Sequence, residues 1–397
     1  MKILLLTSDI DGPGVGFDAK YSKKVIENPD EIYVFHFGER NDQEKKIYSL
    51  NKKNIFNSFI KFKKIYKEEK IDLTHIRGFI GNDQFFWILF LIIIRAKYII
   101  TLSSQLNTYN LNNKLFFNNP DIKGLKKDKK NDLNIINSIR NKINKIITPI
   151  LKKIYLFCFG NFFIKKSKGI IAYSNYELTF VKKYKVKKKI IYEPFFDEQK
   201  EKINLTDDFE FDKSKVNIVY WGRLDYEMKG LDRLIEFTKK IFKEKNYNNV
   251  KIHLMGPNYN FGLEKIEMEI KKNNLSDIIK IHSKEIWSKS NQPLKKADYS
   301  ILLAKWDGSP RSLRESINYN VPIIISEETN FEDLVKSTNC GIVLKQNNTE
   351  EINTFIKNLV SKNYTIINKH KESCNEAKKI ISNDYYRKTM LNFYYDI

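Results

Sequence analysis

The sequence predicts an α/β protein in which two Rossmann-like, doubly wound domains face a central cleft. Strand-like runs alternate with helical patterns along both halves of the 397-residue chain, which is typical of parallel sheets. The chain is also too long for a single typical core. Because the pattern pauses in an acidic, irregular stretch, we expect a first domain at 1–195, a linker at 196–215, a second domain at 216–375, and a terminal helix at 376–397 that packs back on the first domain.

The first half opens with a short apolar run followed by acidic residues, which predicts a first strand rather than a signal peptide. A glycine loop follows at Asp9–Gly16. The apolar run Phe85–Ile94 is too short to span a bilayer, so it indicates a buried helix or, as the alternative, an interfacial segment. The expected strands are Lys2–Thr7, Glu31–Phe37, Leu73–Ile76, Tyr98–Leu102 and Gly169–Tyr173, and the expected helices are Asp18–Glu27, Ile55–Glu69 and Asp83–Arg95.

The second half repeats the same alternation. Its last segment, from Asn353 to about Asn392, has a largely helical pattern. The expected strands are Val216–Trp221, Val250–Leu254, Ile278–His282, Tyr299–Leu303 and Pro322–Ser326, and the expected helices are Gly230–Glu244, Gly262–Asn274 and Arg311–Asn318.

The net charge favours an anionic partner. The chain has 70 Lys and Arg against 48 Asp and Glu, a formal charge of +22. Residues 121–170 hold 13 Lys and Arg against 3 Asp, and isoleucines recur at helical spacing from Ile135 to Ile154. This basic amphipathic stretch predicts either an ordinary surface helix or docking on an anionic membrane. No helix-turn-helix, RNA-binding or zinc module is visible, so nucleic acid is not the expected partner.

The three cysteines are widely spaced and form no CxxC or Cys/His cluster. They therefore indicate neither a zinc site nor a disulfide framework. We expect a cytoplasmic protein, associated with the inner face of the plasma membrane through the basic segment.

A loop that carries two cations follows the first strand of the second half. Gly222 ends that strand, Arg223 and Lys229 lie six positions apart, and Gly230 opens a helix. Ligands of open α/β sheets bind at the carboxyl ends of strands. Arg223 can bind phosphate oxygens with its guanidinium fork, and Lys229 adds a point charge. This stretch predicts a site for a diphosphate.

A second stretch places two carboxylates eight positions apart around a Gly-Ser-Pro turn. Asp307 follows the strand Tyr299–Leu303, and Pro310 suits the first turn of a helix on which Glu315 lies. The free N–H groups at this helix start would face an anion, and carboxylates accept hydroxyl hydrogen bonds from a sugar or a ribose. Together the two stretches predict a pocket for a nucleotide sugar. The expected donor-binding residues in these two stretches are Gly222, Ser309, Pro310, Arg311, Ser312 and Leu313.

The second half resembles the family-4-type glycosyltransferases (glycosyl transferases group 1) of GT-B architecture. The matching elements are the Gly-Arg…Lys-Gly loop, the Gly-Pro turn at Gly256 and Pro257, the Ala297-Asp298 pair, and the two carboxylates followed by Pro322. The resemblance implies that Gly256 and Pro257 also bind the donor. The resemblance covers about residues 216–345 well and the first half more faintly, through the loop Gly12–Gly16, residues 72–75 and Ser174.

The resemblance implies roles for these residues. Arg223 and Lys229 would neutralise the donor diphosphate, Glu315 would bind the ribose, and Asp307 would hold hydroxyls of the donor sugar. In the first domain, Gly14 and Gly16 would let the glycine loop approach the diphosphate. The acceptor, a glycan or a lipid-linked saccharide, would lie mainly on the first domain. The resemblance further implies a UDP- or GDP-linked donor, retention of configuration, and neither cofactor nor metal.

The sequence departs from the family pattern at two positions. Asp307 stands where the family usually has Glu, so the sugar preference can differ. Ser103, followed by Ser104, stands where many members have a His. We treat Ser103 and Ser104 as acceptor-side candidates, together with His75, which lies near a strand end. Alternative functions are a GT-B-like sugar-nucleotide epimerase or hydrolase, and a catalytically degenerate transferase that acts as a partner subunit.

Overall fold

The computed structural model describes most of both domains. The described residues are 1–7, 22–26, 32–37, 46–50, 54–78, 82–102, 160–194, 209–282, 290–305, 307–345 and 348–397. Gly14, Gly16, Ser103 and Ser104, and most of the basic segment 121–170, lie outside them, as does most of the predicted linker.

The first domain is built on a parallel sheet with the order β3-β2-β1-β4-β5-β6-β7. All of its strands except the last, at the sheet edge, are almost wholly buried, because helices or chain segments cover both faces. The strands are β1 Ile3–Leu6, β2 Ile32–His36, β3 Ile47–Ser49, β4 Leu73–Arg77, β5 Tyr98–Thr101, β6 Gly169–Ala172 and β7 Lys187–Ile190.

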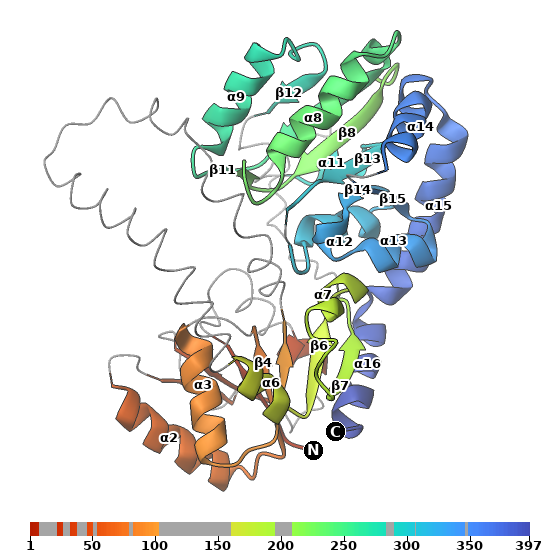
Figure 1. Cartoon of the computed structure of the whole chain (residues 1–397). Coiled ribbons are helices and arrows are strands. Elements are labelled where there is room, and N and C mark those ends of the chain that lie inside the picture. The colour runs from red at the N-terminus through yellow and green to blue at the C-terminus, as the bar shows by residue number, and fades with distance from the viewer. Residues whose placement is uncertain are drawn as a thin grey trace, which may run out of the picture.

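Two hydrophobic clusters hold this sheet between layers. One face packs Leu4, Ile76 and Ile100 against α2 (Ile55–Glu68), α3 (Asn82–Ile93), α6 (Asn161–Lys166) and the segment around α7 (Asn175–Thr179). The opposite face receives α16 (Asn383–Tyr395), whose Tyr386, Met390, Phe393 and Tyr394 pack on the sheet. The C-terminal helix therefore lies on the first domain, beside the N-terminus (Figure 1).

The second domain has its own parallel sheet, ordered β12-β10-β8-β13-β14-β15. The expected alternation of strands and helices is present, and the predicted α/β class with two doubly wound domains is confirmed. A short parallel pair, β9 (Leu224–Asp225) with β11 (Asn258–Tyr259), stands beside the sheet. The main strands are β8 Val216–Trp221, β10 Val250–Met255, β12 Ile279–Ile281, β13 Tyr299–Leu302, β14 Ile323–Ser326 and β15 Gly341–Leu344.

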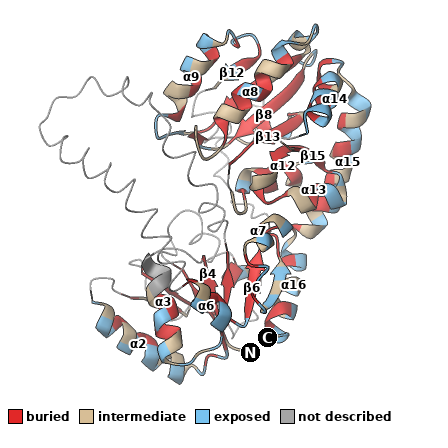
Figure 2. Cartoon of the chain, in the orientation of Figure 1, coloured by how far each residue is buried: buried red, intermediate tan, exposed pale blue. Residues whose placement is uncertain are grey.

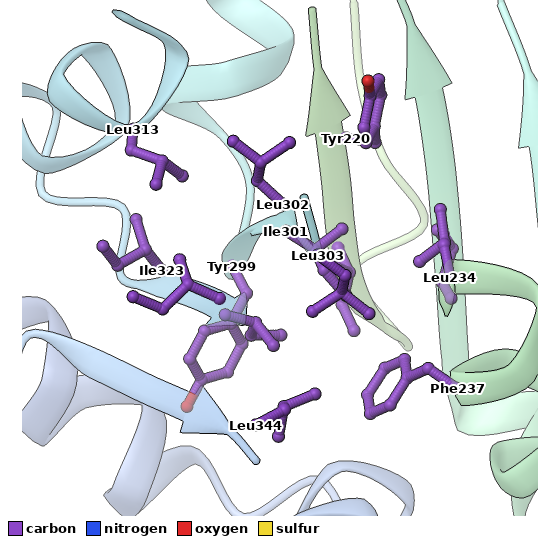
Figure 3. Close-up of a cluster of buried hydrophobic side chains, with 14 of the residues drawn as sticks. Tyr220, Leu234, Phe237, Tyr299, Ile301, Leu302, Leu303, Leu313, Ile323 and Leu344 are labelled. Atoms are coloured by element: carbon purple, nitrogen blue, oxygen red, sulfur yellow. The ribbon is translucent and has the colours of Figure 1, made fainter. Parts of the chain in front are cut away.

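Helices enclose the second sheet, and its strands are buried along almost their whole length (Figure 2). The central cluster contains Tyr220, Leu234, Phe237, Tyr299, Leu313 and Leu344 (Figure 3). The second domain's helices are α8 Leu231–Phe242, α9 Gly262–Lys272, α11 Gln292–Lys295, α12 Arg311–Asn318, α13 Glu332–Thr338, α14 Thr349–Val360 and α15 Tyr364–Ile380, with 3-10 turns at Tyr247–Asn249 and Glu327–Thr329.

The carboxyl ends of the two sheets meet through direct contacts. Ser174, which follows β6, donates from Oγ to Asn330 Oδ1 at 2.6 Å, just beyond β14. The backbone N–H of Asn175 donates to Asp333 at 2.6 Å. These bonds fix the rim of one sheet beside the rim of the other, which is where α/β folds bind ligands.

Candidate functional site

Glycines shape the cationic loop at the carboxyl end of β8. Gly230 has φ +69, and a Cβ there would lie 1.8 Å from the Leu303 carbonyl oxygen. A Cβ on Gly256 would lie 1.7 Å from the Gly222 carbonyl oxygen. Both positions therefore require glycine, which lets the loop approach the ends of β10 and β13 closely.

Backbone bonds hold the loop in place. The Gly222 N–H donates to the Met255 carbonyl at 3.0 Å, and the Leu224 N–H donates to the Pro257 carbonyl at 2.8 Å. The predicted donor residues Gly222, Gly256 and Pro257 are thus brought together. Arg223 is exposed, and its guanidinium carbon lies 4.8 Å from the centre of the Tyr259 ring. Arg223 therefore stacks on β11 rather than on residues 307–310, which we call the acidic turn.

The two stretches that the sequence singled out meet at Lys229 and Asp307. Lys229 Nζ forms an ion pair with Asp307 Oδ2, although 78 residues separate them. Both side chains are largely buried, with 16% and 14% of their surface exposed. An ammonium and a carboxylate therefore share one small volume at the rim of the second sheet, as the sequence predicted.

The second domain supports the acidic turn from behind. The Asp307 N–H donates to the Glu328 carbonyl at 3.0 Å, and Asn330 Nδ2 donates to the Asp307 carbonyl at 2.8 Å. The Arg233 guanidinium donates two hydrogen bonds of 2.9 Å to the Glu328 carboxylate, a bidentate contact. Because Asn330 also accepts from the first domain's Ser174, the position of Asp307 depends on both domains.

The Ser309 hydroxyl oxygen is buried and has no hydrogen-bond partner among the described residues. A buried hydroxyl without a partner is unfavourable by about 1–3 kcal/mol. A ligand oxygen that reached this turn would remove that penalty. Pro310 follows at φ −65, and α12 begins at the exposed Arg311. Ser312 is half-buried, whereas the Leu313 side chain belongs to the core, so only its backbone can face a ligand (Figure 3).

Glu315, the second carboxylate, is oriented by a residue that the sequence analysis did not assign. Trp221 Nε1, at the end of β8, donates to Glu315 Oε2 at 2.8 Å. Trp221 is buried, so its indole cannot easily turn away. The signal in the sequence was only an aromatic residue directly before Gly222.

A second unassigned group joins the two domains. Glu193 forms an ion pair with Arg77 at the end of β4, accepts from Tyr173 Oη at 2.7 Å, and lies 3.7 Å from Arg314 Nη1. Arg314 also donates to the Pro194 carbonyl at 2.8 Å and to the Ser309 carbonyl at 3.1 Å. The chain leaving the first domain is thus tied to the turn between Asp307 and Glu315.

His75 lies in the interior, and both ring nitrogens already have partners. Nδ1 is 2.8 Å from Tyr394 Oη on α16, and Nε2 is 2.5 Å from Thr101 Oγ1. Burial, with the nearby Arg77 charge, holds the pKa of His75 well below its usual value, so the ring is neutral. Here His75 joins the terminal helix to the sheet from a fully buried position. The acceptor-side role expected for it stays a prediction.

Among the described residues, no group of three or more His, Cys, Asp or Glu side chains is placed to hold a metal ion. The rim instead offers two cations, two carboxylates, a buried hydroxyl and the start of α12. Such groups can neutralise a diphosphate and accept hydrogen bonds from sugar hydroxyls. Two doubly wound domains that meet at such a rim define a protein of the GT-B class.

Residues 201–380 match the family model described as glycosyl transferases group 1, so this part of the chain, most of the second domain, is similar to that family. A relative described as an uncharacterized 41.2 kDa protein in the cps region of Klebsiella pneumoniae is 25% identical over 256 residues. That match covers 62% of this chain and 65% of the relative.

Solved structures show the fold over the whole chain. A glycosyltransferase from Rickettsia africae superposes with a TM-score of 0.64 at 14% identity, covering 100% of this chain and 98% of the other. HepE from Anabaena, in complex with UDP and glucose, gives a TM-score of 0.64 at 12% identity and covers 100% of both chains. At these identities the likeness confirms the GT-B fold and goes no further.

Proposed function

We propose that this protein is a glycosyltransferase that moves a sugar from a UDP- or GDP-linked donor to a glycan or a lipid-linked saccharide, with retention of configuration, in the synthesis of a surface polysaccharide. The observation that carries the proposal is the direct contact of Lys229 with Asp307 at the rim of the second sheet. Three similarities support the proposal. Residues 201–380 match the model of the group 1 glycosyl transferases, the similar structure of HepE holds UDP and glucose, and a relative is described from a cps region.

The proposed roles follow from the chemistry of each group. Lys229 would bind the donor diphosphate and stabilise the charge that develops on the leaving group, with Arg223 swinging from Tyr259 to assist. Asp307 would accept hydrogen bonds from donor-sugar hydroxyls, and Glu315, held by Trp221, would accept those of the ribose. These cations and the start of α12 would supply the charge that a metal supplies elsewhere, so we propose a reaction without metal or cofactor.

The acceptor would bind mainly on the first domain, whose rim contacts the second domain beside the acidic turn. Ser174 bonds Asn330, and Glu193 lies 3.7 Å from Arg314. A cytoplasmic location at the inner face of the plasma membrane would suit a lipid-linked acceptor. Among the described residues no helix is long and apolar enough to cross a bilayer. Contact of the 121–170 segment with anionic lipid stays a prediction.

The test is release of nucleoside diphosphate from a panel of UDP- and GDP-sugars, with and without lipid-linked saccharide acceptors. We expect one donor to react only when acceptor is present, and Lys229→Ala or Glu315→Ala to lower release strongly, for Lys229→Ala by about 10²- to 10³-fold. Lys379→Ala, a change at an exposed lysine of α15, is the control and keeps full activity. Release of nucleoside diphosphate without acceptor would instead identify a hydrolase. Conversion of the donor to an isomeric sugar nucleotide would identify an epimerase. Donor binding without turnover would identify a degenerate subunit.

A further inference from the structure

Large apolar side chains are exposed on the outer helices of the first domain. Phe56 and Ile60 lie on α2, Leu89 and Ile93 on α3, and Phe162 on α6. Phe56 has 72% of its surface exposed and Ile93 has 55%. The other exposed large apolar residues among those described are scattered over the second domain and the terminal helices, and four of them are tyrosines. The first domain therefore concentrates its exposed Phe, Ile and Leu side chains.

These helices form one layer, which we call the α2–α3–α6 face. All three pack against the same core cluster, through Phe62, Trp87 and Phe163. The rings of Phe59 and Phe90, 5.0 Å apart between centroids, join α2 to α3 directly. Figure 2 shows exposed residues along the outer sides of α2 and α3, away from the sheet. In the described part of the apolar run, residues 86–94, four side chains are buried and two, Leu89 and Ile93, are exposed.

Cations accompany the apolar residues on this face. Phe56, Ile60, Lys63 and Lys67 are spaced by four, three and four residues, so they form one stripe of α2, and all four are exposed. Exposed Arg95 and Lys97 follow Ile93 closely in the sequence.

On α6 the cations again stand beside the aromatic residue. Exposed Lys165 and Lys166 follow Phe162, and Lys166 Nζ lies 5.8 Å from the centre of its ring. On α2 the acidic Glu68 is 3.9 Å from Lys64 and lies outside the stripe. The face therefore combines apolar tips with an excess of positive charge.

Single exposed apolar residues are ordinary, but apolar pairs one turn apart, each flanked by cations, are typical of helices that lie in a membrane interface. We propose that the α2–α3–α6 face docks on an anionic phospholipid surface, with Phe56, Ile60, Leu89, Ile93 and Phe162 entering the headgroup boundary. Lysines and arginines around them bind lipid phosphates. A second copy of the chain fits less well, because a twofold contact would set these lysines against each other.

Docking on this face deepens the proposed function, because it brings the first domain, where the acceptor is proposed to bind, to the surface that carries a lipid-linked acceptor. It is a separate property, however, since vesicle binding needs neither donor nor turnover. The two proposals can therefore fail independently.

The experiment is co-sedimentation of the full chain with phosphatidylglycerol–phosphatidylcholine vesicles and with pure phosphatidylcholine vesicles. We expect binding to the anionic vesicles only, weakening as salt is added. Lys63→Gln with Lys67→Gln should lower the partition coefficient about 30-fold, and Phe56→Ser with Ile60→Ser on the order of tenfold. All four positions are exposed, so melting temperatures should stay at the wild-type value.

Matched controls lie on α9 of the second domain. Met268 is exposed like Ile60, and Lys271 and Lys272 match the lysine pair. Met268→Ser and Lys271→Gln with Lys272→Gln should leave vesicle binding unchanged.

Three results would overturn the docking proposal. In the first, the wild-type protein does not bind anionic vesicles. In the second, the α2 variants bind them as well as the wild type does, which would assign the contact to the 121–170 segment. Alternatively, the wild type could be a dimer that the Phe56→Ser, Ile60→Ser variant dissociates. Nucleoside diphosphate release, measured in parallel with detergent-solubilised acceptor, should be equal in the wild type and the α2 variants. Its absence in the wild type would count against the proposed function alone.

Discussion

The rims of the two sheets use the same fold in opposite ways. At the second rim, Lys229 and Asp307 stand on loops shaped by glycines and remain partly open to solvent. At the first rim, Arg77 and Glu193 form a buried ion pair, and His75 is sealed by Thr101 and Tyr394. In the proposed function, the charges of the second rim serve ligand chemistry. At the first rim the charges hold the domains and the terminal helix together. Substitutions of charged residues should therefore affect activity at one rim and stability at the other.

The largest expected effect is on stability, at the first rim. Glu193→Ala should lower the free energy of unfolding by about 3–5 kcal/mol, because it leaves the buried Arg77 and Arg314 without their shared carboxylate. Denaturant unfolding followed by circular dichroism measures this. Glu372→Ala, a change on the surface of α15, is the matched control and should shift stability by less than about 0.5 kcal/mol. If the two variants unfold alike, the comparison of the rims is wrong.

At the second rim the expected effect is on activity. Lys229→Ala should lower kcat/KM for the donor about 10²- to 10³-fold, equivalent to about 2.7–4 kcal/mol, because it removes a cation from the leaving group. Its free energy of unfolding should fall by less than that of Glu193→Ala, since Lys229 and Asp307 keep 16% and 14% of their surface exposed whereas Arg77 and Glu193 keep only 3% and 2%. Steady-state kinetics and denaturation on the same sample check both halves. A variant that loses stability and keeps its kcat/KM would reverse the assignment of this rim.

Acid should destabilise the second domain through a pair of histidines in contact, of which His253 is buried and His282 is half-buried. His253 Nδ1 lies 2.9 Å from His282 Nε2, and burial lowers the pKa of His253 to about 3 and that of His282 to about 4. Because the unfolded imidazole binds its proton near pH 6.5, stability is present above that value and is lost as the pH falls toward 3. Protonation of His253 in the unfolded chain should by itself lower the free energy of unfolding by about 2 kcal/mol at pH 5.

The His253→Gln variant separates this effect from general acid denaturation. Its loss of stability between pH 7.5 and pH 5 should be smaller than that of the wild type by about the amount given for His253. Thermal melts at both pH values provide the measurement. Equal losses in the two proteins would show that the pair does not carry the acid sensitivity.

The smallest expected effect concerns the residue that orients Glu315. Trp221→Phe keeps an aromatic ring and removes the bond from Nε1 to Glu315 Oε2. We expect KM for the donor to rise about fivefold, equivalent to about 1 kcal/mol, with kcat within twofold. Trp221→Tyr serves as a second variant if Phe lowers solubility. An unchanged KM would mean that Glu315 holds its position without the indole.

Sequence patterns predicted the fold where burial is continuous. Val216–Trp221 and Tyr98–Leu102 were found because helices cover both faces of their sheets, which leaves an unbroken apolar run. β7 was not predicted, because three of its four residues are lysines at the sheet edge. The short strands β3 and β15 were also not predicted, because three or four residues show too little alternation or apolar length to be recognised.

The site divides in the same way. The meeting of Lys229 with Asp307 follows from the rule that carboxyl ends of parallel strands share one edge. Trp221 with Glu315, and Arg77 with Glu193, are separated by 94 and 116 residues and depend on side-chain packing that no local pattern encodes. For His75, the position near a strand end gave no information on the terminal helix, whose Tyr394 covers the ring.

The most direct test of the account is isothermal titration of the wild-type protein, Lys229→Ala and Glu315→Ala with UDP and with GDP. The account predicts that one of the two nucleotides binds at a single site and that each variant weakens its Kd at least about tenfold, by removing a charged partner of the diphosphate or of the ribose. Binding of equal strength in all three proteins, or no binding of either nucleotide to the wild type, would contradict it.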